Sequence, residues 1–364
     1  MCKSNLPGAT RGSDLAARIR IRTAPLRVRS GRALHRQPQS WQSHRPLPER
    51  ARPCTIGQSI TPGGDPVAGL VLAQIPNSRK YGQHLMPELP EVETVRRGLS
   101  PVMEGRTILR LEVNRPDLRF PFPDRFVERV EAAKVTRLGR RAKFLVTELS
   151  TDEALIMHLG MSGRFTVTGG AEDTADPGTN PKHDHVVFHM AGGAKVTYND
   201  PRRFGFMELW PLDQMDLYPR IKDLGPEPLT NRFSAAYLDE ALAGKAAPIK
   251  SALLDQSIIA GLGNIYVCEA LYRARISPRR KAATLVGVRN ARLAPIINDV
   301  IAEAIAAGGS SISDFSNASG ELGYFQKHFS VYDREGEACE TCGNTIKRLV
   351  QSGRSSFYCG MCQR

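Results

Sequence analysis

Apolar residues recur with two different spacings along the chain, and the change between them marks its organisation. Between residues 107 and 200 they form short runs typical of strands: TILRLEV, KFLVTEL, ALIMHLGM, GRFTVT, HVVFHM and AKVTYND. The last two runs flank a glycine-containing loop, which predicts a β-hairpin. Ahead of them, Val92, Val95 and Leu99 share one face of a predicted helix that opens with prolines and acids. Residues 86–213 are therefore predicted to form a mostly β domain led by a helix.

From about residue 214 the apolar spacing becomes helical. The segments NRFSAAYLDEALAG, APIKSALLDQ, NIYVCEALYRARI and LVGVRNARLAPIINDVIAEAIAAGG are typical of helices. We predict a helical domain over residues 214–329. A short, glycine-rich, cysteine-paired tail follows over residues 330–364.

The first 85 residues show neither spacing. They are rich in Arg, Pro, Ser and Gly, so residues 1–85 are predicted to be a disordered basic extension. Three interpretations stay open: an organelle transit peptide, a flexible arm that helps to hold DNA, or a stretch that is not normally made because translation starts at Met86. We favour the third.

The net charge of +13 belongs mostly to this extension. Residues 1–85 carry 12 Arg and 2 Lys against 3 acids, which is +11, and the rest of the chain carries +2. The total charge of residues 86–364 therefore does not indicate what they bind, and only a local basic patch would indicate nucleic acid. No apolar run approaches the roughly 18 residues of a membrane span, so no membrane association is expected.

Four of the seven cysteines form two C-x-x-C pairs separated by sixteen residues: Cys339, Cys342, Cys359 and Cys362. This spacing predicts a four-thiolate tetrahedral zinc site with a β-hairpin between the pairs. Because all four ligands are thiolates, no position is left for a catalytic water, and the site is predicted to hold one structural Zn²⁺ that folds the tail. The hairpin carries Lys347, Arg348 and Arg354, which predict either a phosphate-binding tip or a merely solvated basic hairpin.

The stretch GLGNIY places G-x-G directly before Asn264 and a helical run. Asn is a preferred N-cap residue, and a helix N-terminus after a glycine turn exposes backbone N–H groups to an anion. A dinucleotide site would need a preceding strand and the full G-x-G-x-x-G, and both are missing from this stretch. A cap without a ligand remains an alternative.

Three motifs now coincide: PELPEVE after Met86, GLGNIY before a helix, and the four-cysteine tail, with GRRAKFL, HLGMSG, KHDHV, DPRRFG and LGPEPL in order between them. Over residues 86–364 the chain resembles the bacterial formamidopyrimidine-DNA glycosylases, the 8-oxoguanine DNA glycosylase family. The resemblance implies an α+β multidomain fold: an N-terminal β-sandwich with flanking helices, a helix-two-turn-helix domain and a zinc-finger hairpin. It also implies damaged double-stranded DNA as the partner, a monomer, and a bacterial cytoplasmic, nucleoid-associated setting.

The resemblance gives Pro87 the role of nucleophile, because in this family the mature enzyme begins at that proline. The amine would attack the sugar C1′ and form an iminium, and β- and δ-elimination would follow. A proline nitrogen inside a peptide is an amide and is not nucleophilic, whereas a free α-amino group has a pKa of about 8. Pro87 should therefore be inert while residues 1–85 stay attached. Taken alone, Pro87 is typical of the first turn of a helix.

The remaining roles come from the same resemblance. Glu88 matches the general acid that opens the sugar ring, and Glu91 is expected to orient the site. Phosphate contacts near the lesion are implied for Lys143, His158, Asn264 and Arg354. Met161, Arg202 and Phe204 match the side chains that fill the space left by a flipped nucleotide. His183, His185 and Arg203 are expected on the opposite strand, and the segment around Ser310 and Ser311 is expected to cover the flipped base.

Two other functions remain open. The endonuclease VIII branch of the same superfamily, which prefers oxidised pyrimidines, usually has Gly where this chain has Leu89. A non-catalytic zinc-finger DNA-binding protein would result if the extension were kept, because binding residues would survive while Pro87 was blocked.

Overall fold

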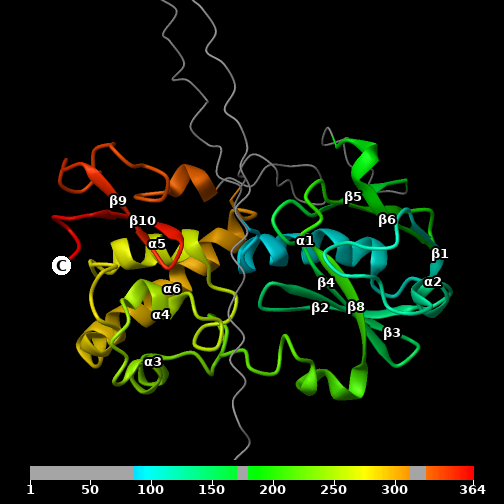
Figure 1. Ribbon diagram of the computed structural model, residues 1–364, viewed down its shortest axis with the longest axis horizontal. Coiled ribbons are helices and arrows are strands. Elements are labelled where there is room, and N and C mark those ends of the chain that lie inside the picture. The colour runs from blue at the N-terminus through cyan, green and yellow to red at the C-terminus, as the bar shows by residue number, and fades with distance from the viewer. Residues whose placement is uncertain (1–85, 170–178, 311–324) are drawn as a thin grey trace, which may run out of the picture. The chain divides into compact units, whose positions relative to one another are not determined.

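The computed structural model describes residues 86–169, 179–310 and 325–364, all within one compact unit of the chain (Figure 1). The extension 1–85, with its predicted disorder, lies outside the described residues. So do residues 311–324, which include Ser311 and most of the loop expected to cover a flipped base.

Two four-stranded antiparallel sheets form the first part of the described chain. Their strand orders are β1-β6-β7-β5 and β2-β3-β4-β8. The strands are β1 (Ile108–Val113), β2 (Val135–Arg141), β3 (Phe144–Leu149), β4 (Glu153–His158), β5 (Arg164–Thr168), β6 (Asp184–Met190), β7 (Lys195–Asn199) and β8 (Phe206–Pro211). The predicted hairpin is confirmed as β6 and β7.

The two sheets enclose one apolar core together with α1 (Leu89–Met103), so the expected β-sandwich is confirmed. Val92, Val95 and Leu99 of α1 are all at most 1% exposed. Burying each such side chain contributes about 1.5–3 kcal/mol. The short helix α2 (Phe126–Val130) adds Phe126 and Val130 to the same core.

The helical part comprises α3 (Ala235–Leu242), α4 (Ile249–Leu253), α5 (Asn264–Arg273) and α6 (Val288–Ala306), as the sequence predicted. Short 3-10 turns lie at η2 (Pro181–His183), η3 (Leu212–Leu217), η4 (Ala282–Leu285) and η5 (Phe325–His328). The terminal hairpin is β9 (Ile346–Gln351) and β10 (Arg354–Cys359). None of the described helices is long and apolar enough to cross a membrane.

A second core joins these helices to both ends of the described chain. Ile346 and Phe357 of the hairpin and Leu89 of α1 are buried in it. Helix α1, cyan in Figure 1, therefore starts in the helical core and continues into the sandwich core. The segment that bears Pro87 thus lies directly before a helix that is buried in two folded cores.

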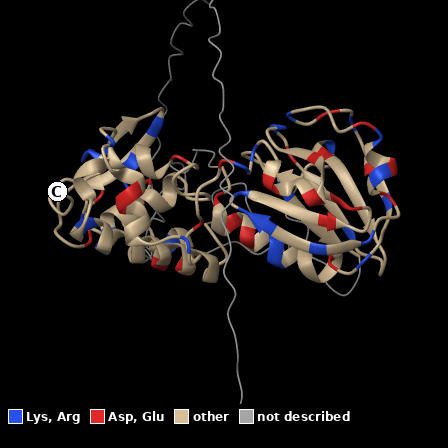
Figure 2. Ribbon diagram, turned by 90° about the horizontal axis from the view of Figure 1, so that it is seen from below, with Lys and Arg blue, Asp and Glu red and all other residues tan. Residues whose placement is uncertain are grey.

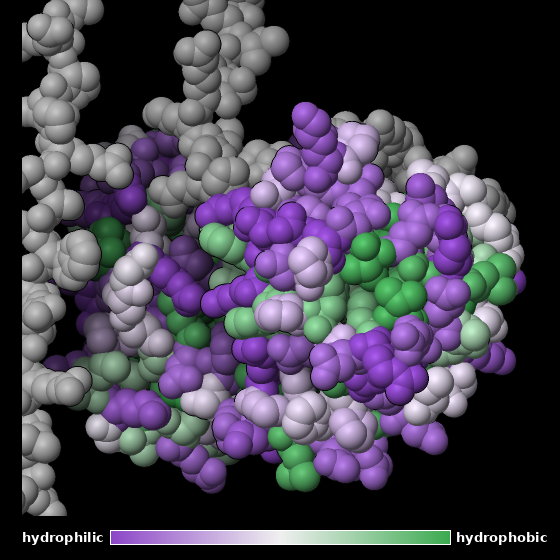
Figure 3. Space-filling model, turned by 45° about the vertical axis from the view of Figure 1, so that its right-hand side comes forward, coloured by the Kyte–Doolittle hydropathy of each residue, from purple (hydrophilic) through white to green (hydrophobic). Residues whose placement is uncertain are grey.

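Charges are interspersed over the described helices and strands (Figure 2). The face of the sandwich in Figure 3 is mostly hydrophilic, with smaller hydrophobic areas among the polar side chains. This even distribution agrees with the small net charge of residues 86–364. A nucleic-acid site on this part of the chain would therefore need a local group of cations.

Candidate active site

A carboxylate that precedes α1 caps the N-terminus of α5. Glu88 Oε1 accepts a hydrogen bond of 3.0 Å from the backbone N–H of Ile265. Gly263 allows this approach, because a Cβ there would lie 2.2 Å from Glu88 Cδ. The expectation that Asn264 is the N-cap was wrong: Gly263 is the N-cap and Asn264 is the first residue of α5. The cap is supplied by a distant residue, which leaves the Asn264 side chain free for another role.

Two buried acceptors at this helix end have no hydrogen-bond donor among the described residues. They are Glu88 Oε2 and Asn264 Oδ1. The Asn264 amide donates only a long hydrogen bond of 3.5 Å to the Tyr332 hydroxyl. Buried polar atoms are nearly always paired, so such exceptions mark candidate functional groups.

Both side chains line a cavity of about 340 Å³. The cavity brings Glu88, Lys143, Asn264 and Arg354 together from four separate parts of the sequence, with Met161 at its wall. Tyr332 and Arg348 also line it, and sequence reasoning had not singled out Tyr332. The cavity combines one carboxylate with a lysine and two arginines, which suits a polar substrate with negative charge.

Burial shifts the pKa values of the ionisable pair in this cavity. It raises the pKa of Glu88 to about 7, although the nearby Lys143 opposes the rise. It lowers the pKa of Lys143, with Glu88 opposing and Arg354 adding to the fall. A carboxyl group with a pKa of about 7 can donate a proton at neutral pH, as a general acid must.

Pro87 is buried directly before Glu88, the N-cap of α1, so the interpretation of Pro87 as a first-turn helix proline was wrong: Pro90 holds that place. The Pro87 nitrogen is joined to Met86, and Met86 lines this cavity and two others. Met86 is therefore shared by the three cavities, and Pro87 is the next residue in the chain. In the chain as it stands, the Pro87 nitrogen is an amide.

Glu91 holds the beginning of α1 in place. Its Oε2 accepts the Glu88 N–H at 3.0 Å, and its Oε1 accepts hydrogen bonds from the Tyr266 hydroxyl and from Ser310 N and Oγ at 2.9 and 2.8 Å. The orienting role expected of Glu91 has a physical basis here, because one side chain links α1, α5 and the chain after α6. Ser310 is itself buried by this contact.

Lys143 lies in the turn between β2 and β3, and an ionic cluster fixes that turn. Glu227 Oε2 and Oε1 pair with Arg140 and Arg141 at 2.6 and 2.8 Å, and Oε1 also accepts the Ala142 N–H at 2.8 Å. Ala142 has φ of 51°, a conformation that non-glycine residues rarely adopt. Glu227 follows the sandwich in sequence, so contacts across the two parts of the fold hold Lys143 at the cavity.

A second cavity, of about 510 Å³, contains the expected void-filling residues. Met161, Arg202 and Phe204 line it together with His158 and Arg203. The Arg202 guanidinium lies 4.8 Å from the Phe204 ring centre, and Phe204 is 41% exposed. Apolar and planar groups therefore gather at one exposed point, as an inserted wedge requires. Met161 lies in the turn after β4, since the strand predicted to reach it ends at His158.

The buried side chain of Asp200 fixes the two loops that carry Met161, Arg202 and Phe204. Its fully buried carboxylate accepts hydrogen bonds from Ser162 Oγ at 2.5 Å, Arg202 N at 3.2 Å and Gly205 N at 2.9 Å. It therefore ties the turn that bears Met161 to the loop that bears Arg202 and Phe204. Sequence reasoning did not single out Asp200.

His158 lies in a buried environment close to several cations. Burial lowers the pKa of His158 to about 4, with Lys143, Arg119 and Arg220 adding to the fall. His158 Nδ1 accepts the Gly160 N–H at 3.0 Å, so the neutral ring carries its proton on Nε2. His158 is thus a hydrogen-bond donor without charge.

The residues expected on the opposite strand are not equally accessible. His185 is 4% exposed and its Nε2 is hydrogen-bonded to the Asp200 carbonyl at 2.9 Å, so little of its side chain is accessible to DNA. His183 is half-buried beside it. Arg203 is exposed, has φ of 56°, and lies 3.7 Å from Asp117.

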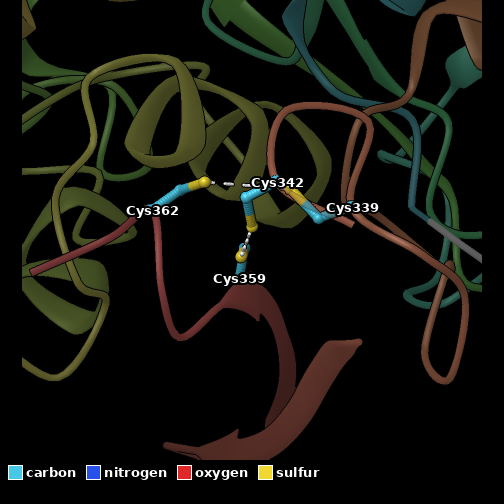
Figure 4. A group of neighbouring side chains, drawn as sticks. All are labelled: Cys339, Cys342, Cys359 and Cys362. Atoms are coloured by element: carbon cyan, nitrogen blue, oxygen red, sulfur yellow. Dashed lines mark hydrogen bonds between the residues drawn. The ribbon is translucent and has the colours of Figure 1, made fainter. Parts of the chain in front are cut away.

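The four cysteines form a cluster at the end of the chain (Figure 4). Their Sγ atoms all lie within 4.8 Å of one another, with Cys339–Cys362 at 3.8 Å and Cys342–Cys359 at 3.5 Å. A tetrahedral zinc site with metal–sulfur bonds of about 2.3 Å has sulfur–sulfur edges of about 3.8 Å. The cluster therefore fits one structural Zn²⁺. The Tyr272 hydroxyl lies 3.3 Å from Cys339 Sγ.

Three family models match successive parts of the chain. They are the formamidopyrimidine-DNA glycosylase N-terminal domain over residues 86–207, the H2TH domain of the same glycosylase over 224–316, and the zinc finger found in FPG and IleRS over 336–364. The formamidopyrimidine-DNA glycosylase of Ruegeria pomeroyi is 59% identical over 283 residues, which is 77% of this chain and all of the relative. That of Azorhizobium caulinodans is 55% identical over 296 residues.

The chain belongs to the formamidopyrimidine-DNA glycosylase family. Solved structures of the family agree with its fold. The Thermus thermophilus Fpg protein is 36% identical, with a TM-score of 0.67 over 76% of this chain and 98% of that one. A Lactococcus lactis Fpg in complex with DNA containing an abasic site is 34% identical, with a TM-score of 0.67 over 76% of this chain and 99% of that one.

The family match starts at Met86, the residue directly before the PELPEVE motif. The boundaries at 213/214 and 329/330 stay predictions. What sequence reasoning missed in this glycosylase are the supporting groups Asp200 and Glu227. Both lie inside motifs that the sequence displays, DPRRFG and LGPEPL, but their partners Ser162 and Arg140 are 38 and 87 residues away along the chain.

Proposed function

We propose that residues 86–364 act as a bifunctional DNA glycosylase and AP lyase that excises oxidised purines, 8-oxoguanine and formamidopyrimidines, from duplex DNA. The supporting observation is the single cavity that holds Glu88, Lys143, Asn264 and Arg354 beside Pro87. A nucleophile, an acid with a suitable pKa and several phosphate-binding groups are the parts that this chemistry needs.

The proposed reaction begins with Pro87 as a free secondary amine. Its nitrogen bonds to C1′ while Glu88 gives a proton to the ring oxygen O4′ and the C1′–O4′ bond opens. The proton released by the amine balances the proton taken up by the departing base. Loss of the base leaves a cationic iminium between C1′ and the Pro87 nitrogen. Loss of a C2′ proton then expels the 3′ phosphate, and a further elimination expels the 5′ phosphate.

The other residues bind and position the DNA in this proposal. Lys143, Asn264 and Arg354 hold phosphates around the lesion, and His158 donates a neutral N–H to another. Met161, Arg202 and Phe204 fill the space left when the damaged nucleotide leaves the stack. His183 and Arg203 contact the other strand. The expected cellular setting is bacterial cytoplasm at the nucleoid, with the enzyme acting as a monomer.

The chain in which Met86 stays joined to Pro87 is a second candidate state, that of a non-catalytic DNA-binding protein. Met86 lines all three cavities, so it occupies space beside Glu88 for as long as it stays joined to Pro87. We infer that every form of the chain in which Met86 is still joined to Pro87 binds DNA without forming a covalent intermediate. Release of the Pro87 nitrogen would convert this binding protein into the enzyme.

Borohydride trapping tests both states. A duplex with one 8-oxoguanine is incubated with the chain beginning at Met1 and with the chain beginning at Met86, and each is sequenced from its N-terminus. We expect a covalent adduct only where sequencing gives Pro87 first. Absence of an adduct with that form would disprove the mechanism, and an adduct with an intact extension would show that another amine is the nucleophile. Competition with a 5-hydroxyuracil duplex distinguishes the pyrimidine branch.

A further inference from the structure

A third cavity, of about 290 Å³, lies next to the one around Glu88. Lys143 and Arg354 line both cavities, and Arg220 and His158 line the third. None of the residues lining it is acidic. With two arginines, a lysine and the neutral N–H donor of His158, it is built for an anion.

Arg220 is held rigidly at this cavity. Its guanidinium lies 4.7 Å from the ring centres of both Phe120 and Phe206. Cations are attracted to aromatic faces, and arginine is the cation most often found there. Arg220 Nη2 also lies 3.1 Å from Glu208 Oε1, on β8. Three contacts therefore restrain one side chain before any ligand arrives.

These contacts do not occupy all the N–H donors of the Arg220 guanidinium. Nε and Nη2 face Glu208, whereas no hydrogen bond of Nη1 is found among the described residues, and the side chain remains 39% exposed. An arginine has five N–H donors in a fixed plane, which suits phosphate oxygens. A pre-positioned arginine loses little side-chain entropy when it binds.

We propose that Arg220 binds a backbone phosphate of the DNA, beyond the phosphates held by Lys143 and Arg354. The inference rests on the proposed function, since it assumes that the ligand is DNA. Arg220 comes from the segment after η3 that leads out of the sandwich, so it adds a third cation to the lining that Lys143 and Arg354 provide in the third cavity. Neither composition nor motif indicated it.

The competing explanation is that Arg220 serves only to neutralise Glu208, which also accepts a hydrogen bond from Tyr218. The two explanations differ in the salt dependence of DNA binding. Each phosphate that a protein neutralises contributes about 0.9 to the slope of log Kd against log salt concentration on duplex DNA. A purely structural ion pair contributes nothing to that slope.

The experiment measures Kd by fluorescence anisotropy over a series of salt concentrations, with the full chain and a duplex containing one 8-oxoguanine. Arg220→Gln removes the cation, and Glu208→Gln breaks the same ion pair but keeps the cation. Arg137→Gln is the matched control, because Arg137 also pairs with a strand carboxylate at 3.1 Å and is absent from the lining of all three cavities. Contributions of the basic extension are equal in all variants and cancel in the differences.

We expect Arg220→Gln to lower the slope by about 0.9 and Glu208→Gln and Arg137→Gln to keep the wild-type slope. An unchanged slope in Arg220→Gln overturns the proposal. An equal fall in Glu208→Gln also overturns it, because the effect would then come from the ion pair. If the wild-type chain binds no DNA, the proposed function itself fails, and this result is distinct from either outcome.

Discussion

The Glu88 carboxylate and the Ile265 amide, 177 residues apart in sequence, are joined by a hydrogen bond of 3.0 Å. This contact places the acid at the N-terminus of α5, where the helix dipole favours negative charge. Burial nevertheless dominates and raises the pKa of Glu88 to about 7. The same contact therefore orients one oxygen and leaves the other facing the cavity, ready to hold a proton.

We predict that the rate of base excision falls as pH rises above about 7, the pKa of Glu88. The acid form is required, and its fraction declines once pH exceeds the raised pKa. Glu88→Gln should slow excision by roughly 10²–10⁴-fold and remove this alkaline limb. Single-turnover rates across neutral pH, measured on the form that begins at Pro87, check both points. Glu104→Gln, at the far end of α1, is the control and should keep the limb, whereas a limb that survives in Glu88→Gln would rule Glu88 out as the acid.

Gly263→Ala should damage the site through one methyl group. The added Cβ would lie 2.2 Å from Glu88 Cδ, so either the carboxylate or the start of α5 has to move. Overpacking of this kind costs about 1–3 kcal/mol, and we expect a matching loss of unfolding free energy together with slower excision. Gly139→Ala is the control, because its Cβ would meet its nearest neighbour at 3.5 Å. Equal effects in the two variants would mean that the Glu88 contact is not what Gly263 protects.

Local patterns in the sequence were enough to predict much of this fold. The strands that became β1, β3 and β6 carry clear apolar runs, and the cysteine spacing identified the hairpin between the two pairs. Strand β2 was missed because three of the seven residues of VTRLGRR are arginines, and the partners of Arg140 and Arg141 lie elsewhere in the chain. Strand β8 was missed as well, since FMELWP follows directly on the DPRRFG loop.

In the candidate site, too, local motifs predict some of the residues, and the others are recognised only from contacts in the folded chain. Motifs supplied Glu88, Lys143 and Arg354, but the groups that position them come from tertiary contacts that no local pattern encodes. The capping of α5 illustrates this: Asn264 has the preferred residue type, yet the carboxylate of Glu88, which precedes α1, occupies the place of the cap. Long-range partners of this kind become visible only in the folded chain.

Glu227→Gln should destabilise the protein strongly. Glu227 is buried and pairs with both Arg140 and Arg141, and breaking a buried ion pair from one side costs about 3–5 kcal/mol. Urea unfolding gives the change directly. The exposed pair of Arg137 supplies the control, since Glu148→Gln should cost no more than about 1 kcal/mol. If the loss of unfolding free energy in Glu227→Gln is no larger than in the control, the ionic cluster of Glu227, Arg140 and Arg141 does not hold the turn that bears Lys143.

The stabilisation by Glu227 should also depend on pH. Burial alone would raise the pKa of this carboxyl group, but Arg140 and the donors around it outweigh burial and lower the pKa. A depressed pKa contributes stability that is present above the ordinary carboxyl pKa and is lost as pH falls through the folded value. The difference in unfolding free energy between wild type and Glu227→Gln should therefore shrink on acidification. A difference that stays constant with pH would contradict this assignment.

Tyr272→Phe should weaken the hold on zinc without unfolding the helical core. The Tyr272 hydroxyl lies 3.3 Å from Cys339 Sγ and 2.8 Å from Thr341 Oγ1, so it can donate to the sulfur while accepting from the threonine. Hydrogen bonds to metal ligands of this kind typically change metal affinity by about 10–100-fold. Zinc transfer to a coloured chelator at fixed pH measures the effect, and we expect faster transfer from Tyr272→Phe. Tyr237→Phe removes a comparable hydroxyl bond, 2.9 Å to the Ile258 carbonyl, and should release zinc at the wild-type rate. If both variants release zinc alike, the Tyr272 contact belongs to packing, and the finger depends on its four thiolates alone.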